Sequence, residues 1–216
     1  MSGAELVELT SAWVDGWAIS RATPRPVPVA GGFRIDLGQP GRPARYVLHT
    51  YDQAMVARLG HGSTAPGTEI KTVGSTSALR AALPGDWTMY PPCDLMTSAF
   101  SHAEVELPAA YTARIVDDGG ALLGLVLDID GDIAASARLA PSGRYGVVDQ
   151  VWTRPAHRRH GLGTLLMTML GNRAVSLGLT TGVLSATDDG RALYRALGWT
   201  ARGPLAGAFR RVIMNS

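Results

Sequence analysis

The sequence predicts an α+β protein with a mixed, mainly antiparallel, twisted sheet flanked by helices. Two patterns support this fold class: β-like segments separated by turn sequences occupy residues 111–153, and the chain then alternates helix, strand, helix and strand. Shorter helical and β-like patterns precede them. With 216 residues, 46% hydrophobic and 18% charged, the chain is long and apolar enough to bury a substantial core.

The N-terminal region is expected to begin with an amphipathic helix over residues 3–18. Leu9, Trp13 and Trp17 recur at helical spacing, and the proline-rich residues 24–28 follow as an extended linker. Two β-like runs, two short helices and an irregular aromatic segment come next, at 32–37, 45–51, 52–60, 75–83 and 86–100.

The C-terminal region is expected to begin as an antiparallel meander. Its β-like segments are YTARIV, LLGLVLDI, IAASARLA and YGVVDQVWT, and the intervening DDGG, DGD and PSG are turn sequences. A helix, an apolar strand, a second helix and a last strand should follow at 163–177, 181–187, 191–197 and 209–214. From Tyr111 the sequence changes to a succession of β-like segments, so the boundary between the two regions is expected between residues 100 and 110. We therefore expect an N-terminal α/β region over 1–105 and a second domain over 106–216.

The composition argues against several classes of partner. Lys and Arg number 20 against 18 Asp and Glu, a net charge of +2 that predicts neither nucleic-acid nor membrane binding from bulk electrostatics. Cys93 is the only cysteine, which excludes an internal disulfide and a cysteine-based zinc site. No signal-peptide pattern and no apolar run of the ~18 residues needed to span a bilayer is present. A cytoplasmic location is expected.

An aspartate-rich run, Asp128-Ile-Asp130-Gly-Asp132, resembles a metal-binding loop at first sight. Its spacing does not match the calcium loop of an EF-hand, and a DG hairpin turn accounts for these residues. We expect no metal.

Residues 158–163, Arg-Arg-His-Gly-Leu-Gly, lie where an expected strand turns into a helix. The N–H groups at a helix start are free and the helix dipole is positive there, so this turn is suited to an anion. Arg158 and Arg159 add donors that match phosphate geometry. The P-loop pattern GxxxxGK[ST] is absent, and Leu166 stands where GxGxxG needs its third glycine. The motif is therefore Arg-x-x-Gly-x-Gly, with a ligand-free surface turn as the alternative.

Preceded by Val151-Trp152-Thr153-Arg154-Pro155, this motif resembles the pyrophosphate-binding motif of the GNAT superfamily of acyl-CoA-dependent N-acyltransferases. Residues 193–199, LYRALGW, resemble the second signature of the same family. The resemblance covers roughly 111–216. It implies a GNAT-type fold and direct transfer from acetyl-CoA, as co-substrate, to a primary amine of a small molecule or peptide. A non-catalytic acyl-CoA-binding or sensor module and transfer of a longer acyl group are the alternatives.

The resemblance also implies how coenzyme A would bind. Main-chain N–H groups of 159–164, with charge from Arg158, would hold the pyrophosphate, and the backbone of 151–153 would pair with the pantetheine arm. The Val151 N–H would polarise the thioester carbonyl. The implied cofactor-binding residues are Val151, Trp152, Thr153, Arg158, Arg159, His160, Gly161, Leu162, Gly163, Thr164 and Thr187.

Two residues are implied in proton transfer. Tyr194 matches the family's tyrosine that protonates the departing CoA thiolate, the alternative being a core tyrosine. Asp149 is either the base for the amine or an ordinary strand aspartate. Thr187 stands where relatives commonly carry an asparagine that contacts pantetheine, so a hydroxyl replaces an amide there. His157 and His160 either touch phosphate or are incidental surface residues.

The role of residues 1–105 has two interpretations. They form an enlarged or degenerate half that shapes the amine pocket, with the aromatic segment supplying Trp87, Met89, Tyr90 and Cys93 near it. Alternatively, they serve structural packing or form a homodimer surface. Direct transfer requires no cysteine nucleophile, so Cys93 is not expected to be one.

Overall fold

The computed structural model describes residues 2–62 and 65–211. Its helices are α1 (Gly3–Ser20), α2 (Gln53–His61), α3 (Thr76–Ala82), α4 (Leu162–Ser176) and α5 (Asp188–Ala196), with a 3-10 turn at Pro155–His157. Its strands are β1 (Val27–Val29), β2 (Gly32–Gln39), β3 (Arg42–Leu48), β4 (Glu69–Val73), β5 (Trp87–Met89), β6 (Cys93–Ala99), β7 (Thr112–Asp118), β8 (Ala121–Leu127), β9 (Ile133–Ser142), β10 (Tyr145–Thr153), β11 (Thr181–Thr187) and β12 (Thr200–Arg210).

The strands form one continuous sheet in the order β1-β2-β3-β4-β12-β6-β11-β10-β9-β8-β7, and β5 pairs with β12. The pairs β3/β4 and β10/β11 are parallel and the other pairs are antiparallel. The expected mixed, mainly antiparallel α+β fold is therefore confirmed.

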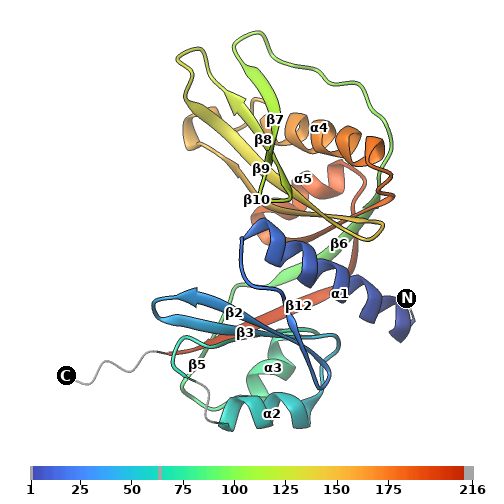
Figure 1. Ribbon diagram of the computed structural model, residues 1–216. Helices are drawn as coiled ribbons and strands as arrows, with labels where there is room; N and C mark the ends of the chain where they lie inside the picture. Colours follow the sequence, from blue (N-terminus) through green and yellow to red (C-terminus); the bar gives the residue numbers. More distant parts are fainter. Residues whose placement is uncertain (1, 63–64, 212–216) are drawn as a thin grey trace, which may run out of the picture.

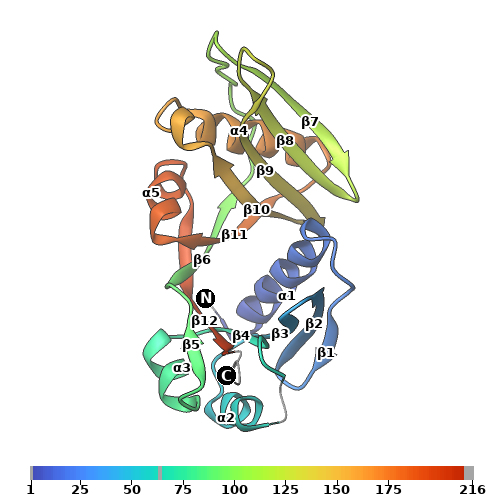
Figure 2. The same ribbon diagram turned by 90° about the vertical axis from the view of Figure 1, so that its left-hand side faces the viewer.

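The helices cover the two faces of the sheet unequally (Figures 1 and 2). Helix α1 packs on one face across the middle of the molecule, where Trp13 and Trp17 meet residues of β10, β11 and β12. Helices α4 and α5 pack on the opposite face of the C-terminal part, and α2 and α3 on that face of the N-terminal part. Each part of the sheet thus has its own core, and α1 bridges them.

Several expected elements form as the local sequence predicts. α1 runs two residues past the expected end and begins with a capping box between Ser2 and Glu5. The four strands over 111–153 form the expected meander, with β7, β8, β9 and β10 paired in succession. At the β8–β9 hairpin, Asp128 Oδ1 accepts from the N–H groups of Asp130 and Asp132, as expected of a DG turn.

The expectation that 86–100 is irregular is wrong. This segment contains β5 and β6, and β6 lies in the middle of the sheet between β12 and β11. Leu95, Met96 and Thr97 are consecutive and buried, because helices cover both faces of β6. A strand buried on both faces shows no alternation of apolar and polar residues, so the pattern that predicts half-buried strands fails here.

Two further boundaries need correction. The last strand is β12, over 200–210, so the expected strand at 209–214 overlaps it by two residues and its residues 212–214 lie outside the described chain. The early part of β12 contains a bulge between Ala201 and Gly203, where the register with β6 shifts. α5 begins at Asp188, three residues earlier than expected, since Asp188 and Asp189 favour the positive end of its dipole.

Candidate active site

A cleft opens where β10 separates from β11. The two strands pair only at Tyr145–Thr181, Gly146–Gly182 and Val147–Val183, and beyond these positions β10 turns away. The turn coincides with a bulge between Asp149 and Trp152, in which Gln150 takes a left-handed φ of 54°. The remaining part of β10 therefore faces the cleft with an edge that β11 leaves unpaired.

The cleft contains a cavity of about 760 Å³. Its wall is formed by the second half of β10, the loop before α4, the first turn of α4, the end of β11 and one side of α5. The lining residues are Val148, Asp149, Gln150, Val151, Trp152, Thr153, His157, Arg158, Arg159, Gly161, Leu162, Gly163, Thr164, Ser185, Thr187, Asp189, Gly190, Ala192, Leu193, Tyr194 and Ala196. A cavity of this size is typical of a site for a sizeable organic ligand.

The N-terminus of α4 opens onto this cavity without a side-chain cap. Gly161 is the N-cap residue with φ of 76°, and the first intrahelical hydrogen bond joins the Leu165 N–H to the Gly161 carbonyl. The N–H groups of residues 162–164 therefore have no acceptor within the helix, which makes this turn an anion site. A Cβ at Gly161 would meet nothing within 4 Å, so glycine is needed there for its φ.

Gly163 has a different reason to be glycine. It is helical, and a Cβ at this position would lie 2.9 Å from the Leu193 Cδ2 atom of α5. The second glycine of the motif therefore lets α5 approach α4. The motif combines one glycine needed for backbone conformation with one needed for packing.

The loop before α4 carries the cationic side chains. Arg158 and Arg159 line the cavity, and Arg159 has a left-handed φ of 65°. His157 also lines it and lies 3.4 Å from the Asp128 carboxylate, while its Nδ1 is 3.0 Å from the Tyr111 hydroxyl.

His160 differs from its neighbours in this loop. Its Nδ1 lies 2.8 Å from the Tyr111 hydroxyl, and the residue is not among those that line the cavity. Tyr111 thus lies between His157 and His160, and these contacts tie the loop to β7. Of the residues predicted from the sequence to bind the cofactor, His160 alone is not brought to the cavity wall.

Tyr194 lines the cavity and is 7% exposed. Its ring fits against Gly190 one turn earlier in α5, where a Cβ would lie 2.9 Å from Tyr194 Cε2. Burial raises the pKa of Tyr194 to about 12, and the negative charge of Asp149 contributes. The phenol therefore stays protonated at neutral pH and can act as a donor.

Asp149 lies on β10 at the bulge and is fixed by two residues from the end of α1. Its Oδ2 accepts from Arg21 Nε at 2.5 Å and from the Ser20 hydroxyl at 2.7 Å, and its Oδ1 accepts from Arg21 Nη2 at 3.0 Å. The aspartate is thus held in one orientation at the cavity wall. The sequence contains no local signal for this contact, because Ser20 and Arg21 precede Asp149 by more than a hundred residues.

The structure brings together residues from both sequence motifs. The predicted residues Asp149, Val151–Thr153, Arg158, Arg159, Gly161–Thr164, Thr187 and Tyr194 all line the one cavity. Several lining residues were not predicted from the sequence, among them the polar residues Gln150 and Ser185. Thr187 is the N-cap of α5 but makes no side-chain cap hydrogen bond.

Comparisons with known proteins agree with this arrangement. The model of the acetyltransferase (GNAT) family matches residues 87–199. Among solved structures, the chain is similar to a GCN5-related N-acetyltransferase from Kribbella flavida, with a TM-score of 0.70, 19% identity and 95% of each chain covered. It is also similar to a GCN5-related N-acetyltransferase from Sphaerobacter thermophilus, with a TM-score of 0.59, 16% identity and 86% of this chain and 79% of that chain covered.

A third similar structure is a tandem GNAT protein from the clavulanic acid biosynthesis pathway, with a TM-score of 0.56, 14% identity and 96% of each chain covered. At these identities the likeness shows the fold. No curated protein sequence matches the chain significantly.

The family model spans more than half of the chain, so this protein belongs to the GNAT acetyltransferase family. Members of the family are acyltransferases that take the acyl group from acyl-CoA. In the part of the chain that the structure describes, no helix is both long and apolar enough to cross a membrane.

Proposed function

We propose that this protein transfers an acetyl group from acetyl-CoA directly to a primary amine of a small molecule or peptide. The observation that carries the proposal is the single cavity between β10 and β11. It is lined by an uncapped helix start with two arginines, by a strand edge that β11 leaves unpaired and by a protonated tyrosine. This combination suits a long ligand with a diphosphate at one end and a thioester at the other.

Coenzyme A would be held largely by the main chain. Its pyrophosphate would accept hydrogen bonds from the N–H groups of 159–164, and Arg158 would add positive charge. The pantetheine arm would lie along residues 151–153 as an additional strand. The Thr187 hydroxyl faces the same cavity and would bond the arm from the opposite side.

The reaction would proceed by attack of the amine nitrogen on the thioester carbon. The Val151 N–H would donate to the carbonyl oxygen as negative charge develops there. The carbon–sulfur bond then breaks and the thiolate leaves. A phenol with a pKa of about 12 transfers a proton to a thiolate, whose acid has a pKa of about 8.5, only when the two are held close, so Tyr194 would act first as a hydrogen-bond donor to the developing charge.

The amine must lose a proton before or during the attack, and we assign Asp149 to accept it, directly or through a water molecule. Arg21 and Ser20 fix the orientation of its carboxylate toward this task. The assignment rests on position, since Asp149 and Tyr194 share one cavity wall and are close enough for the charge of Asp149 to affect the pKa of Tyr194.

The test is a panel of primary amines incubated with purified protein and acetyl-CoA, with release of free CoA thiol as the signal. At least one amine should give turnover, and Asp149→Asn should lower kcat by about a hundredfold while acetyl-CoA affinity stays within about twofold. Asp130→Asn, in an exposed turn, is the matched control and should keep full activity. Binding of acetyl-CoA with no thiol release for any amine would favour a non-catalytic binding module. Faster turnover with butyryl-CoA would favour a longer acyl group.

A further inference from the structure

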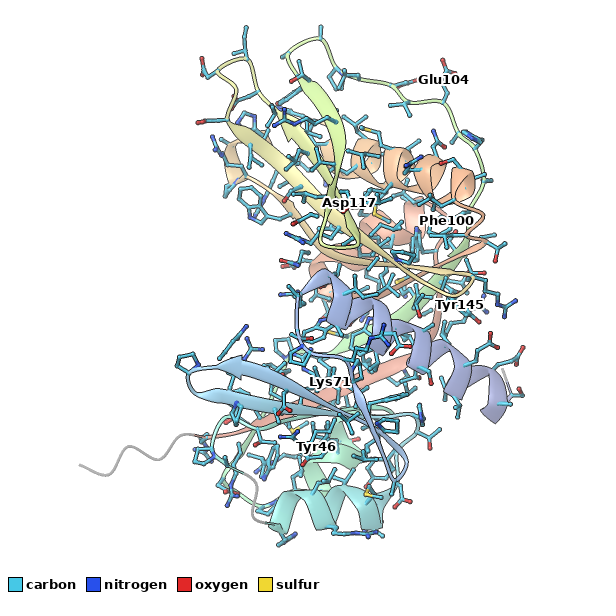
Figure 3. All side chains as sticks on the ribbon, viewed as in Figure 1. Tyr46, Lys71, Phe100, Glu104, Asp117 and Tyr145 are labelled. Atoms are coloured by element: carbon cyan, nitrogen blue, oxygen red, sulfur yellow. The ribbon has the colours of Figure 1, made fainter. Side chains whose placement is uncertain are left out.

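Lys71 is the only lysine of the chain, and it lies in the interior strand β4. Pairing across the sheet places it on the face that carries Asp149. Lys71 pairs with Gly207 on β12, Leu205 pairs with Cys93 on β6, and Cys93 pairs with Thr187 on β11. Val183, which shares a face of β11 with Thr187, pairs with Val147, two residues before Asp149 on β10. Figure 3 shows Lys71 beneath α1, on the side of the N-terminal part that faces the rest of the molecule.

The ammonium group of Lys71 has no ion-pair partner among the described residues. Its nearest acidic neighbour in the strand, Glu69, is already paired with Arg42 at 2.7 Å and with Arg45 at 2.6 Å. No salt bridge to Lys71 forms among residues 2–62 and 65–211, and its Nζ lies 5.6 Å from the ring centroid of Tyr90. A largely covered cation without a partner is costly, so such a group is commonly retained for a ligand or for chemistry.

Burial is the strongest influence on the pKa of Lys71, and its charged surroundings are mixed. Burial lowers the pKa of Lys71, and the charge of Arg45 lowers it further, whereas Cys93, Glu69 and Asp149 act in the opposite direction. The influence of Asp149 shows that Lys71 lies within electrostatic reach of the proposed catalytic centre. Lys71 remains partly exposed, so a ligand can reach it.

We infer that Lys71 binds a carboxylate carried by the acceptor, which makes the acceptor a small amino acid with its reacting amine at the end remote from that carboxylate. The inference rests on the proposed function, since it places the amine of the same molecule near Asp149. The charge supports a carboxylate as the ligand, because one ammonium group matches one carboxylate. A phosphate would be bound better by arginine, but the two nearby arginines already have partners. Arg42 and Arg45 both pair with Glu69, and Arg45 also lies 4.1 Å from the Trp17 ring centroid.

The distance across the sheet sets the length of the acceptor. Asp149 lies on β10, four strand spacings of about 4.8 Å each from β4, and the lysine side chain spans only part of that distance. An α-amino acid reacting at its α-amine would not reach from Lys71 to Asp149. An acceptor with several bonds between carboxylate and amine would.

The experiment compares matched pairs of probes on the wild-type protein. ω-Amino acids from β-alanine to 6-aminohexanoate are each set against the corresponding amide, which keeps the amine and removes the negative charge. For at least one pair, kcat/KM for the acid should exceed that for the amide by about tenfold or more, mainly through KM. Because this arm needs no variant, it does not depend on how a substitution affects folding.

Lys71→Met should then remove the preference for the acid by raising its KM, while acetyl-CoA affinity and the activity on the amide stay unchanged. Lys71→Arg should keep part of the preference, since it keeps the charge. Arg114→Met removes an exposed cation from β7 and is the control for overall charge.

Three results would overturn the inference. One is equal kcat/KM for acids and amides in the wild-type protein, when some amine is acetylated. Another is a Lys71→Met variant that binds acetyl-CoA normally and keeps the preference. The third is mass-spectrometric detection of acetylation on Lys71 at a rate that matches turnover, which would make Lys71 itself the acceptor. By contrast, failure of every amine in the panel would overturn the proposed function first.

Discussion

The two halves of this molecule share an order of helices and strands, but they differ in strand pairing and in the capping of the crossover helix. In the C-terminal half, β10 leads through α4 into the parallel strand β11, followed by α5 and β12. In the N-terminal half, β3 leads through α2 into the parallel strand β4, followed by α3 and β5. Both halves thus contain a strand, a crossover helix and a parallel strand (Figure 2).

The first difference lies in strand pairing. β3 and β4 stay paired from Arg45–Glu69 to Leu48–Thr72, which includes the last residue of β3. β10 and β11 pair over three positions and then diverge at the bulge. Of the two parallel strand pairs, only β10 and β11 therefore separate to leave a free strand edge between them, along which an extended ligand could bind.

The second difference lies at the start of the crossover helix. Asp52 caps α2 by accepting from the Met55 N–H, and Ser75 caps α3 by accepting from the Ala78 N–H. Gly161 at the start of α4 has no side chain to do so. The two halves thus share a topology, but the N–H groups at the helix start are free to bind an anion only in α4 and not in α2. The strand pairing and the capping residue, rather than the fold alone, create the site. We propose that residues 1–105 are a degenerate half that serves the acceptor side.

The largest expected effect comes from blocking the open helix start. Gly161→Asp places a negative side chain at the free N–H groups and strains the left-handed backbone, so acetyl-CoA affinity should fall by more than about a hundredfold in calorimetry. Gly178→Asp is the matched control, because Gly178 has a nearly equal φ of 77° at the other end of α4 with no atom within 4 Å of its Cβ. Equal affinity in both variants would show that the anion binds elsewhere.

Removing the phenol should act on the chemical step. Tyr194→Phe should lower kcat by about a hundredfold with acetyl-CoA affinity nearly unchanged. Because the pKa of Tyr194 is raised to about 12, its loss as a donor should produce no fall in wild-type rate between pH 7 and about pH 10. Tyr145→Phe, which removes a hydroxyl bonded to Glu8 instead, should keep kcat. An unchanged kcat in Tyr194→Phe would assign this ring to packing.

A smaller effect is expected from the loop cation. Arg158→Gln should weaken acetyl-CoA binding about tenfold and make the remaining affinity less sensitive to salt, because a charge-assisted contact is lost. Arg173→Gln, in the last turn of the same helix, is the control and should change neither quantity. If the two variants behave alike, the main-chain N–H groups would hold the diphosphate without Arg158.

The smallest effect is expected in the N-terminal half, where Asp52 caps the start of α2. Asp52→Ala removes the cap of α2 and should lower the free energy of unfolding by about 1 kcal/mol in urea titrations. The stoichiometry should stay at one acetyl-CoA per chain, since β3 and β4 remain paired. Asp130→Ala in an exposed turn is the stability control. A second equivalent of bound acetyl-CoA in Asp52→Ala would mean that capping alone separates the two halves.

Much of the C-terminal half could be predicted because its signals are local. Turn sequences define the meander, and adjacent residues place glycine and arginine at the start of α4. Tyr194 and the α4 turn line one cavity, and both could be singled out from the sequence because their motifs resemble those of a family. The assignment of β6 failed because a strand covered on both faces lacks a period of two, and the start of α5 was placed too late because its aspartates are polar.

The sequence by itself determined the strands of the meander, the helices around them and the position of an uncapped helix start, since these depend on residues within a few positions of one another. Tertiary structure alone decided that β10 diverges from β11, that Arg21 of α1 holds Asp149, and that Lys71 shares a sheet face with that carboxylate. These outcomes depend on strand order and register, which bring together residues far apart in the chain and which no local pattern of side chains encodes.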